Sequence, residues 1–344
     1  MLTPTPMMSL RTETYARTRA LQVFRQTLEA VVARDAIEKQ VMTFASRLRR
    51  DEERMAQALG RPVRGLDILE IGAGQQCERA RYLGQYNLTT VIDLDWIPRT
   101  SGIGDYVAML KRNGVGRLIK TAGRRLLRVD RMRRDAWARA LGTSTFRDPF
   151  MMHGDVCSDP LPESAFDLIV SWSVFEHLRD PAAAMRNIWR ALRPDGVFFI
   201  GIHLYTATNG HHDFSRSQTG DDGLPPWAHL RPSTRHLVRP SAFLNEWRVA
   251  DWRRLYADYA EVKEYLDDYG DAVRMRGLLT DSLRAELDAF DEPELVTIDA
   301  YYVGKKPPTV NVTTLPEPSM SVPEAANSVT ALREPSVSEL PEAV

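Results

Sequence analysis

The residues best suited to chemistry surround one glycine-rich turn. Glu70 precedes Gly72-Ala73-Gly74, and Asp93 ends the next apolar run along the chain. Glycine allows a tight turn and leaves no side chain between the main chain and a ligand. A carboxylate that ends a second strand, roughly 20 residues past such glycines, can accept hydrogen bonds from both vicinal hydroxyls of a ribose. The pattern predicts a nucleotide-type ligand site.

A buried strand and a helix are predicted to hold this turn. The apolar run from Leu66 to Ile71 predicts a strand, and the segment after Gly74 has helical character. Residues 88–97, rich in β-branched side chains, predict a second strand that ends in Asp93 and Asp95. In an open α/β sheet, ligands bind at the carboxyl ends of such strands.

The same alternation continues along the chain. The run His-Gly-Asp-Val at residues 153–156 precedes an apolar strand at Leu168 to Val170, which is typical of a buried parallel sheet. Asp180-Pro181 opens a helix, because proline is favoured in a first helical turn. A turn at residues 193–196 leads into another buried strand that ends near His203. This repetition predicts a doubly wound α/β domain.

Taken in order, these segments resemble the class I S-adenosylmethionine-dependent methyltransferases, and most closely the methyltransferase type 11-like domain. The resemblance covers about Leu66 to Leu204. It rests on Glu70-Ile71-Gly72-Ala73-Gly74, Asp93, Gly154-Asp155-Val156, Phe166 to Val170, Glu176-His177-Leu178 with Asp180-Pro181, and Leu192 to Gly196. Two positions depart from the family's pattern: Gln76 replaces its third glycine, and Pro194-Asp195-Gly196 replaces its PGG turn.

The resemblance implies an α/β, Rossmann-like fold with a seven-stranded, mostly parallel sheet and helices on both faces. It also implies S-adenosyl-L-methionine as the cofactor. The cofactor-binding residues would be Glu70, Gly72, Ala73, Gly74 and Ser171 at the methionine end, Asp93 at the ribose, and Asp155 with the amide of Val156 at the adenine. Ser171 is expected just past the fourth strand, and His177 is expected to be structural.

Charge supports this choice of cofactor. S-adenosylmethionine carries a sulfonium and an ammonium and no phosphate, so Glu70 suits it, whereas a dinucleotide needs free amides for its pyrophosphate. Purely structural roles also stay open: Asp93 and Asp155 can cap turns, and Glu70 can pair with an arginine.

The segment after the fifth strand is the predicted acceptor loop, residues 205–238, because a long polar loop at a strand's carboxyl end is more often functional than structural. An alcohol acceptor needs a base. Candidate catalytic residues are His203, His211 and His212, with Asp213 as an orienting or alternative base. No metal is predicted at 211–213, because adjacent side chains on an extended chain point opposite ways.

A saccharide or another small polar molecule is the preferred acceptor. The loop's aromatic side chains can stack on sugar faces, and its Asn, Asp and His side chains can bind hydroxyls. The pattern Trp-Ala-His-Leu followed by Phe-Leu-Asn-Glu-Trp, within residues 227–247, resembles more loosely methyltransferase-domain proteins found with bacterial surface-glycan synthesis. The acceptor's identity and the methylated atom stay open.

Several other segments complete the predicted organisation. Residues 1–62 predict an N-terminal helical extension that packs on the catalytic domain or covers its cleft, and simple packing is favoured. The catalytic domain spans 63–305 and includes a basic helical insertion at 99–150. An amphipathic helix is expected from Pro240, and an antiparallel strand pair is expected to close the sheet. The tail, 306–344, is aperiodic and rich in Pro, Ser and Thr, which predicts disorder.

Composition bounds the compartment and the partners. A formal net charge of -1 over 344 residues gives no global reason to expect a polyanionic partner. The 2 cysteines are too few for a disulfide framework, which indicates a reducing compartment. No apolar run is long enough to cross a bilayer, and no signal peptide is evident, so a cytoplasmic location is expected.

The basic stretch at residues 111–134 suggests peripheral membrane contact, although a solvated helix face is the commoner meaning of such a run. Nucleic-acid binding is not expected, because no aromatic stacking platform accompanies the charges. Two other classes of protein stay open: a non-catalytic methyltransferase-fold binding protein at a membrane or glycan assembly, and an NAD-dependent oxidoreductase, which Glu70 and Gln76 disfavour. The oligomeric state is open.

Overall fold

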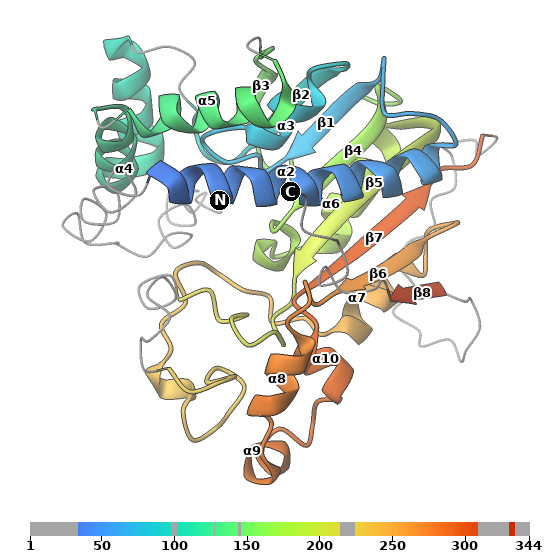
Figure 1. The fold of residues 1–344 in the computed structure, drawn as a ribbon. Coiled ribbons are helices and arrows are strands. Elements are labelled where there is room, and N and C mark those ends of the chain that lie inside the picture. The colour runs from blue at the N-terminus through green and yellow to red at the C-terminus, as the bar shows by residue number, and fades with distance from the viewer. Residues whose placement is uncertain are drawn as a thin grey trace, which may run out of the picture.

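One mixed sheet organises the molecule. The computed structural model describes residues 34–97, 102–126, 128–143, 146–213, 224–308 and 330–333. Its described strands form an 8-stranded sheet in the order β3-β2-β1-β4-β5-β7-β6-β8 (Figure 1). They are β1 Asp67–Ile71, β2 Leu88–Asp93, β3 Phe150–His153, β4 Phe166–Trp172, β5 Leu192–His203, β6 Lys263–Asp267, β7 Asp299–Lys305 and β8 Thr330–Arg333. The predicted seven-stranded sheet is confirmed, with β8 added at its edge.

Strand direction brings the predicted site residues to one edge of the sheet. Strands β1 to β5 run parallel to one another, whereas β7 runs antiparallel to both β5 and β6. The carboxyl ends of β1, β2, β4 and β5 therefore lie at the same edge as the amino end of β7. His203, the last residue of β5, is consequently in register with Asp299, the first residue of β7.

Helices cover both faces of the sheet, as predicted for a doubly wound domain. They are α2 Arg34–Leu59, α3 Glu78–Leu83, α4 Ile103–Leu126, α5 Val129–Leu141, α6 Pro181–Ala191, α7 Val249–Tyr256, α8 Ala272–Leu278, α9 Asp281–Glu286 and α10 Glu292–Val296, with short 3-10 helices η1 Phe175–His177 and η2 Arg235–Leu237. Alternation along each strand separates two cores. Ile68 and Val170 face α2 and α5, whereas Leu69 and Ile169 face α6 and α7.

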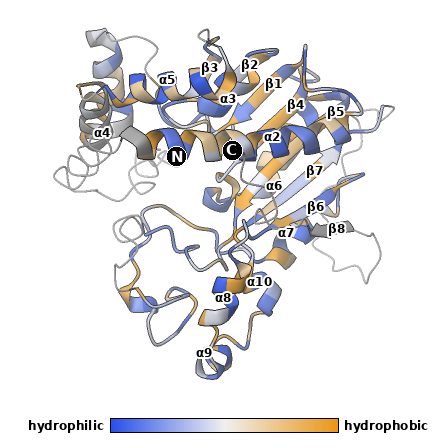
Figure 2. Ribbon diagram, in the orientation of Figure 1, coloured by the Kyte–Doolittle hydropathy of each residue, from blue (hydrophilic) through white to orange (hydrophobic). Residues whose placement is uncertain are grey.

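The N-terminal extension is helical where it is described. Helix α2 buries one side, whose residues recur at helical spacing: Ile37, Val41, Ala45, Leu48 and Met55. Figure 2 shows this mixed pattern on α2 and the mainly hydrophobic strands β1, β4 and β5 beneath it. Residues 1–33 of the predicted extension lie outside the described residues.

A small lobe, made of α8, α9, α10 and Trp227, has its own apolar cluster below the sheet (Figure 1). The helix predicted from Pro240 is wrong over its first half, because α7 begins only at Val249. The preceding chain is held extended instead: the Asn245 side chain donates to the carbonyl oxygens of Phe175 and Leu178. These contacts fasten the segment to η1 and prevent it from coiling.

The chain directly after β7 is attached to the core. Lys306 is 2% exposed, and its Nζ donates to the carbonyl oxygens of Trp189 and Leu192 at 2.9 and 2.8 Å. The predicted tail, 306–344, lies mostly outside the described residues, and its residues Thr330–Arg333 form β8 beside β6. Among the described helices, none is long and apolar enough to cross a membrane.

Candidate cofactor and acceptor sites

The glycine turn after β1 has the backbone that the sequence predicts. Gly72 has φ 69 and donates its amide to the carbonyl oxygen of Ile92 at 2.8 Å. A Cβ at Gly72 would lie 2.4 Å from Val174 Cγ2, so a side chain at this position would collide with Val174. Gly74 has φ 65, but a Cβ there would meet no atom within 4 Å. The turn is packed on one side and open at Gly74.

Asp93 ties the end of β2 to this turn. Its Oδ2 accepts from the amide of Gly74 at 3.0 Å, and its Oδ1 accepts from the amide of Asp95 at 2.8 Å. A carboxylate oxygen can accept more than one hydrogen bond. The turn-capping role is therefore observed, and the predicted binding of a ribose at Asp93 is compatible with it and stays a prediction.

Glu70 is buried at the end of β1, with 1% of its surface exposed. Burial raises the pKa of this carboxyl to about 7, and the charge of Arg79 opposes the shift. Its Oε2 makes no hydrogen bond within the described part of the chain. A buried acceptor without a donor is costly, and the ammonium of S-adenosylmethionine supplies both a donor and the opposite charge. The residues present therefore fit the cofactor.

Asp155 begins the loop after β3 and stabilises its turn. Its Oδ1 accepts from the amide of Cys157 at 2.8 Å, and its own amide donates to Asp159 at 2.8 Å. Val156 is buried, and its carbonyl oxygen accepts from Asn187. The capping alternative for Asp155 is thus observed, and adenine binding at Asp155 and Val156 stays a prediction.

The fourth strand ends later than predicted, and this changes the position of Ser171. Strand β4 continues through Trp172, so Ser171 lies inside the strand, fully buried, with Oγ donating to the carbonyl oxygen of Ile71 at 3.2 Å. The prediction that Ser171 lies past the strand is wrong. Ser173, with φ 53, is the serine at that edge. Ala73 packs against an apolar cluster that includes Val91.

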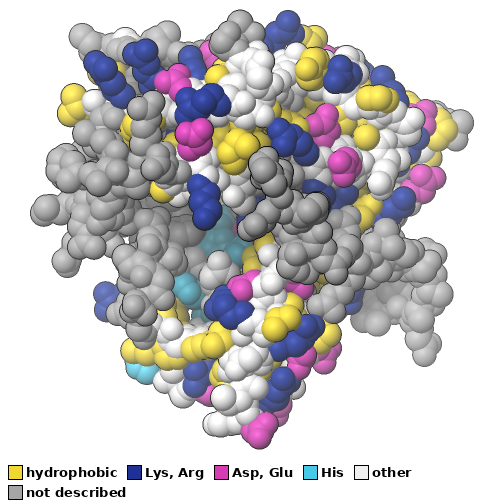
Figure 3. All heavy atoms as spheres, in the orientation of Figure 1, with side chains coloured by type: hydrophobic (Ala, Val, Ile, Leu, Met, Phe, Trp, Pro, Cys, Tyr) yellow, Lys and Arg dark blue, Asp and Glu magenta, His cyan; other side chains and the backbone are white. Residues whose placement is uncertain are grey.

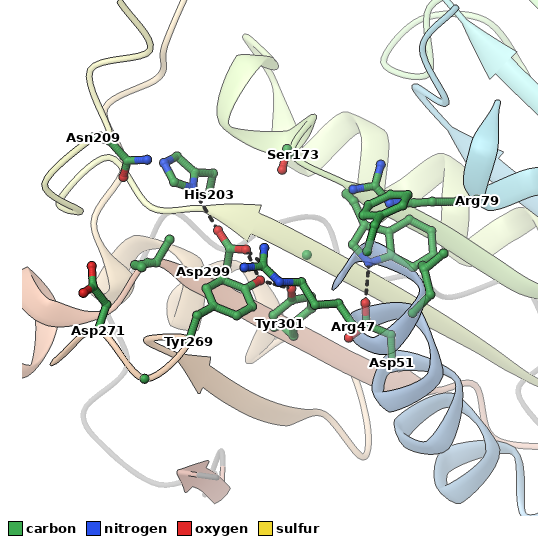
Figure 4. A pocket seen from close by; sticks show the side chains of 16 residues that line it. Arg47, Asp51, Arg79, Ser173, His203, Asn209, Tyr269, Asp271, Asp299 and Tyr301 are labelled. Atoms are coloured by element: carbon green, nitrogen blue, oxygen red, sulfur yellow. Dashed lines mark hydrogen bonds and ion pairs between the residues drawn. The ribbon is translucent and has the colours of Figure 1, made fainter. Parts of the chain in front are cut away.

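A cavity of about 540 Å³ opens where α2 crosses the ends of β4, β5 and β7. Figure 4 shows how side chains from these elements point into it. Its polar and aromatic lining includes Arg47, Asp51, Arg79, Trp172, Ser173, His203, Asn209, Tyr269, Asp271, Asp299 and Tyr301. Its volume falls within the range of small-molecule sites, about 300–1,000 Å³.

His203 and Asp299 form a pair in this cavity. His203 Nδ1 lies 2.8 Å from Asp299 Oδ1, and the hydroxyl of Tyr269 donates to Asp299 Oδ2 (Figure 4). Burial disfavours a charged imidazole, but the hydrogen bond and charge of Asp299 outweigh burial and raise the pKa of His203 above its ordinary value. A carboxylate on Nδ1 fixes the tautomer of a neutral histidine with its proton there, which leaves Nε2 able to accept a proton.

The other predicted catalytic residues do not line this cavity. His211 Nδ1 accepts from the amide of Asp213 at 2.9 Å, so its neutral ring carries the proton on Nε2 and has no lone pair to offer there. Asp213 is buried and accepts from the amide of Arg239 at 3.0 Å. His212 is buried beside His203. Of the predicted bases, the structure brings His203 alone into the described cavity.

Adjacent histidines 211 and 212 do point to different neighbours. The ring of His211 lies 5.5 Å from that of His229, whereas the ring of His212 lies 5.0 Å from His203 and 4.8 Å from His177, measured between centroids. Residues 214–223 of the predicted acceptor loop lie outside the described residues.

Sequence reasoning named no residue of α2 as a site residue. It favoured simple packing of the N-terminal helices over covering the cleft, yet Arg47 and Asp51 of α2 also line the cavity. Asp51 accepts from Trp172 Nε1 at 2.9 Å, and burial raises its pKa to about 7 against the charge of Arg54. Asp299 was missed as well. The sequence offered one signal for each residue: Asp51 is a charged residue on the buried side of a helix, and Asp299 is a charged residue at the first position of a strand.

The basic insertion is not one continuous helix. Helix α4 has a kink with non-helical backbone at Gly114 and ends at Leu126, and α5 begins at Val129, after Arg128 in a left-handed conformation. Two arginines of α5 pair with acids of neighbouring helices: Arg133 Nε lies 2.7 Å from Glu78, and Arg139 Nε lies 3.1 Å from Glu38. Part of the positive charge is therefore neutralised within the molecule, and the membrane contact stays a prediction.

The strand order and the glycine turn define the fold of a class I S-adenosylmethionine-dependent methyltransferase. A family model described as "Methyltransferase domain" matches residues 39–255, which is more than half of the chain. The chain therefore belongs to this methyltransferase-domain family.

Individual relatives are more distant. The chain is 42% identical over 48 residues to a Mycolicibacterium smegmatis protein named "Probable S-adenosylmethionine-dependent methyltransferase"; the match covers 14% of this chain and 19% of that protein. The chain thus spans about a fifth of that relative's length. Solved structures that are similar include an S-adenosylmethionine-dependent methyltransferase from Mesorhizobium loti, with TM-score 0.40, 17% identity, and 74% of this chain and 98% of that one covered. Another is Haemonchus contortus phosphoethanolamine N-methyltransferase 2 in complex with S-adenosyl-L-methionine, with TM-score 0.39, 13% identity, and coverage of 75% and 52%.

Proposed function

We propose that this chain transfers the methyl group of S-adenosylmethionine to a hydroxyl of a small polar acceptor bound in the cavity beneath α2. Membership of the methyltransferase-domain family supports the methyl donor. The observation that carries the choice of a hydroxyl is the His203–Asp299 pair, because an alcohol has to lose its proton to become a good nucleophile.

The proposed chemistry is an in-line displacement. Nε2 of His203 takes the hydroxyl proton, the acceptor oxygen bonds to the methyl carbon, and the carbon–sulfur bond breaks to leave neutral S-adenosylhomocysteine. Asp299 holds the ring of His203 and stabilises the imidazolium that forms, as the acid of a catalytic triad does. Much of the acceleration comes from holding the two reactants in line.

A saccharide or a similar polyhydroxylated molecule suits the lining best. Tyr269, Tyr301 and Trp172 supply aromatic surface, and Asn209, Asp271 and Ser173 supply groups that bind hydroxyls. Figure 3 shows histidine side chains at the base of a hollow between the sheet and the small lobe, which gives an acceptor a route to the site. The free thiols of Cys77 and Cys157 fit a reducing compartment, and the proposal places the protein in the cytoplasm.

The test is methyl transfer from labelled S-adenosylmethionine into a panel of acceptors. The panel contains monosaccharides, oligosaccharides and simple polyols, with matched amines and thiols. Transfer to a hydroxyl that His203→Gln slows by about 10²–10⁴-fold supports the proposal. Transfer only to amines, or equal rates with His203→Gln, contradicts it. Cofactor binding without any transfer favours the alternative of a non-catalytic binding protein.

A further inference from the structure

Three side chains that could bind a metal ion meet beside the proposed base. Glu176 and His177 lie in η1, just past the end of β4, and His212 comes from the loop after β5. One donor atom from each lies within 4.8 Å of the other two. The group is close to the acceptor cavity, because the ring of His212 also lies 5.0 Å from that of His203.

Glu176 is the strongest indication that this group can bind a cation. It is 2% exposed, and neither carboxylate oxygen makes a hydrogen bond within the described part of the chain. Burying a carboxylate without a partner costs free energy, and a bound cation would compensate for that cost.

The surroundings of the two histidines suit metal binding. His177 Nδ1 lies 2.7 Å from the carbonyl oxygen of Phe243, so it donates a proton there and leaves the Nε2 lone pair available. A backbone carbonyl on the far nitrogen is the usual support of a metal-binding imidazole. His212 is 6% exposed, and its ring centroid lies 4.8 Å from that of His177. His212 is buried and His177 is half-buried, and a neutral imidazole is the form that binds metals.

We propose that Glu176, His177 and His212 bind one divalent transition-metal ion. Zn²⁺ serves as the reference ion for the geometry and the test. Two imidazoles and one carboxylate are a donor set typical of such ions, whereas Ca²⁺ and Mg²⁺ prefer oxygen ligands throughout. In a tetrahedral zinc site, neighbouring donors lie about 3.4 Å apart, from bond lengths of about 2.0–2.1 Å. The side chains therefore have to close on the ion by about 1 Å.

Three protein ligands leave a coordination position open. A cation here would lie next to His203 and could hold the acceptor's oxygen and lower its pKa. That role rests on the proposed function, whereas binding of the ion does not.

The site is tested with Zn²⁺ and Co²⁺ alone, titrated by calorimetry into untagged, chelator-treated full-length protein without acceptor. We expect one equivalent to bind. Glu176→Gln and His212→Ala should each weaken binding by at least about 100-fold, since loss of a supporting outer partner alone costs about 10- to 100-fold. His236→Ala removes an exposed histidine of η2 and is the matched control, which should bind as the wild type does.

Cobalt adds a spectroscopic readout, because its visible absorption depends on the ligand set, and Glu176→Gln should change it. Binding of S-adenosylhomocysteine by each variant reports that it is folded. Glu176→Gln, which removes a buried charge and keeps the shape of the side chain, decides the question if His212→Ala does not fold. Absence of stoichiometric binding by the wild type, or equal binding by Glu176→Gln, overturns the proposal. Neither result bears on methyl transfer, which the acceptor panel measures separately.

Discussion

Glu70→Gln should weaken cofactor binding and remove most of its pH dependence. In the folded protein this carboxyl is 1% exposed, Oε2 has no hydrogen-bond partner among the described residues, and its pKa is raised to about 7. We expect the cofactor's ammonium to be its partner. A hydrogen bond to a charged group contributes about 1.5–3 kcal/mol, which corresponds to about 10- to 150-fold in affinity.

The pH dependence has a definite sign. Below about pH 7, Glu70 is protonated and loses its attraction for the ammonium, so the affinity of the wild type should fall as the pH is lowered. Between pH 7.5 and pH 6, the ionised fraction of a carboxyl with a pKa of about 7 falls about eight-fold, and the affinity should follow it. In Glu70→Gln, this change should disappear.

Calorimetric titration with S-adenosylhomocysteine, which keeps the ammonium, measures both effects without an acceptor. Glu163→Gln is the matched control, because Glu163 is exposed and lies away from the glycine turn. If Glu70→Gln binds as tightly as the wild type at pH 7.5, or keeps the same pH profile, the assignment of Glu70 to the ammonium is refuted.

Three further predictions concern the base, the turn and the anchoring of the chain's end. Asp299→Asn should lower turnover by about 10- to 150-fold, because it removes a charge-assisted hydrogen bond to His203, and cofactor affinity should not change. The control is Asp288→Asn, which changes an exposed residue. Turnover at the wild-type rate would contradict the role of the His203–Asp299 pair. Gly72→Ala should lower the free energy of unfolding, measured by chemical denaturation, more than Gly74→Ala does. Each substitution costs about 1–2 kcal/mol because alanine disfavours a positive φ. Only Gly72→Ala also places a methyl group against Val174, which costs about 1–3 kcal/mol more. Equal losses of stability would show that the turn relaxes. Lys306→Met should lower the free energy of unfolding by about 1–3 kcal/mol, because it orphans two buried carbonyl oxygens. Lys305→Met, whose amine lies 3.5 Å from Asp195 at the surface, should cost less than about 1 kcal/mol; a reversed order would argue that Lys306 does not anchor the chain.

Local sequence patterns predicted the elements that form the proposed cofactor site. The strand before Gly72, the acid that ends β2 and the proline that opens α6 are each set by neighbours in sequence, so they were predicted near their observed positions. The helix expected from Pro240 failed for the opposite reason. Its apolar spacing suits a helix, but Asn245 binds carbonyl oxygens of η1, some 70 residues away in sequence.

The acceptor half depended on contacts between distant segments. His203 could be named as a base from its place at the end of a strand, but its partner Asp299 is brought to it only by the antiparallel pairing of β5 and β7. His211 and His212 looked equivalent in the sequence. The fold sends one towards His229 and the other towards His177.

The sequence by itself therefore determined the class of fold and the strands and turn at which we predict the cofactor to bind, because glycine conformations and strand-ending acids act over a few residues. The tertiary structure alone decided which histidine lies in the cavity, which carboxylate orients it, and that α2 forms one of its walls. It also brought Glu176, His177 and His212 together. These arrangements depend on how the strands pair and on which groups are buried, and no short stretch of sequence records either.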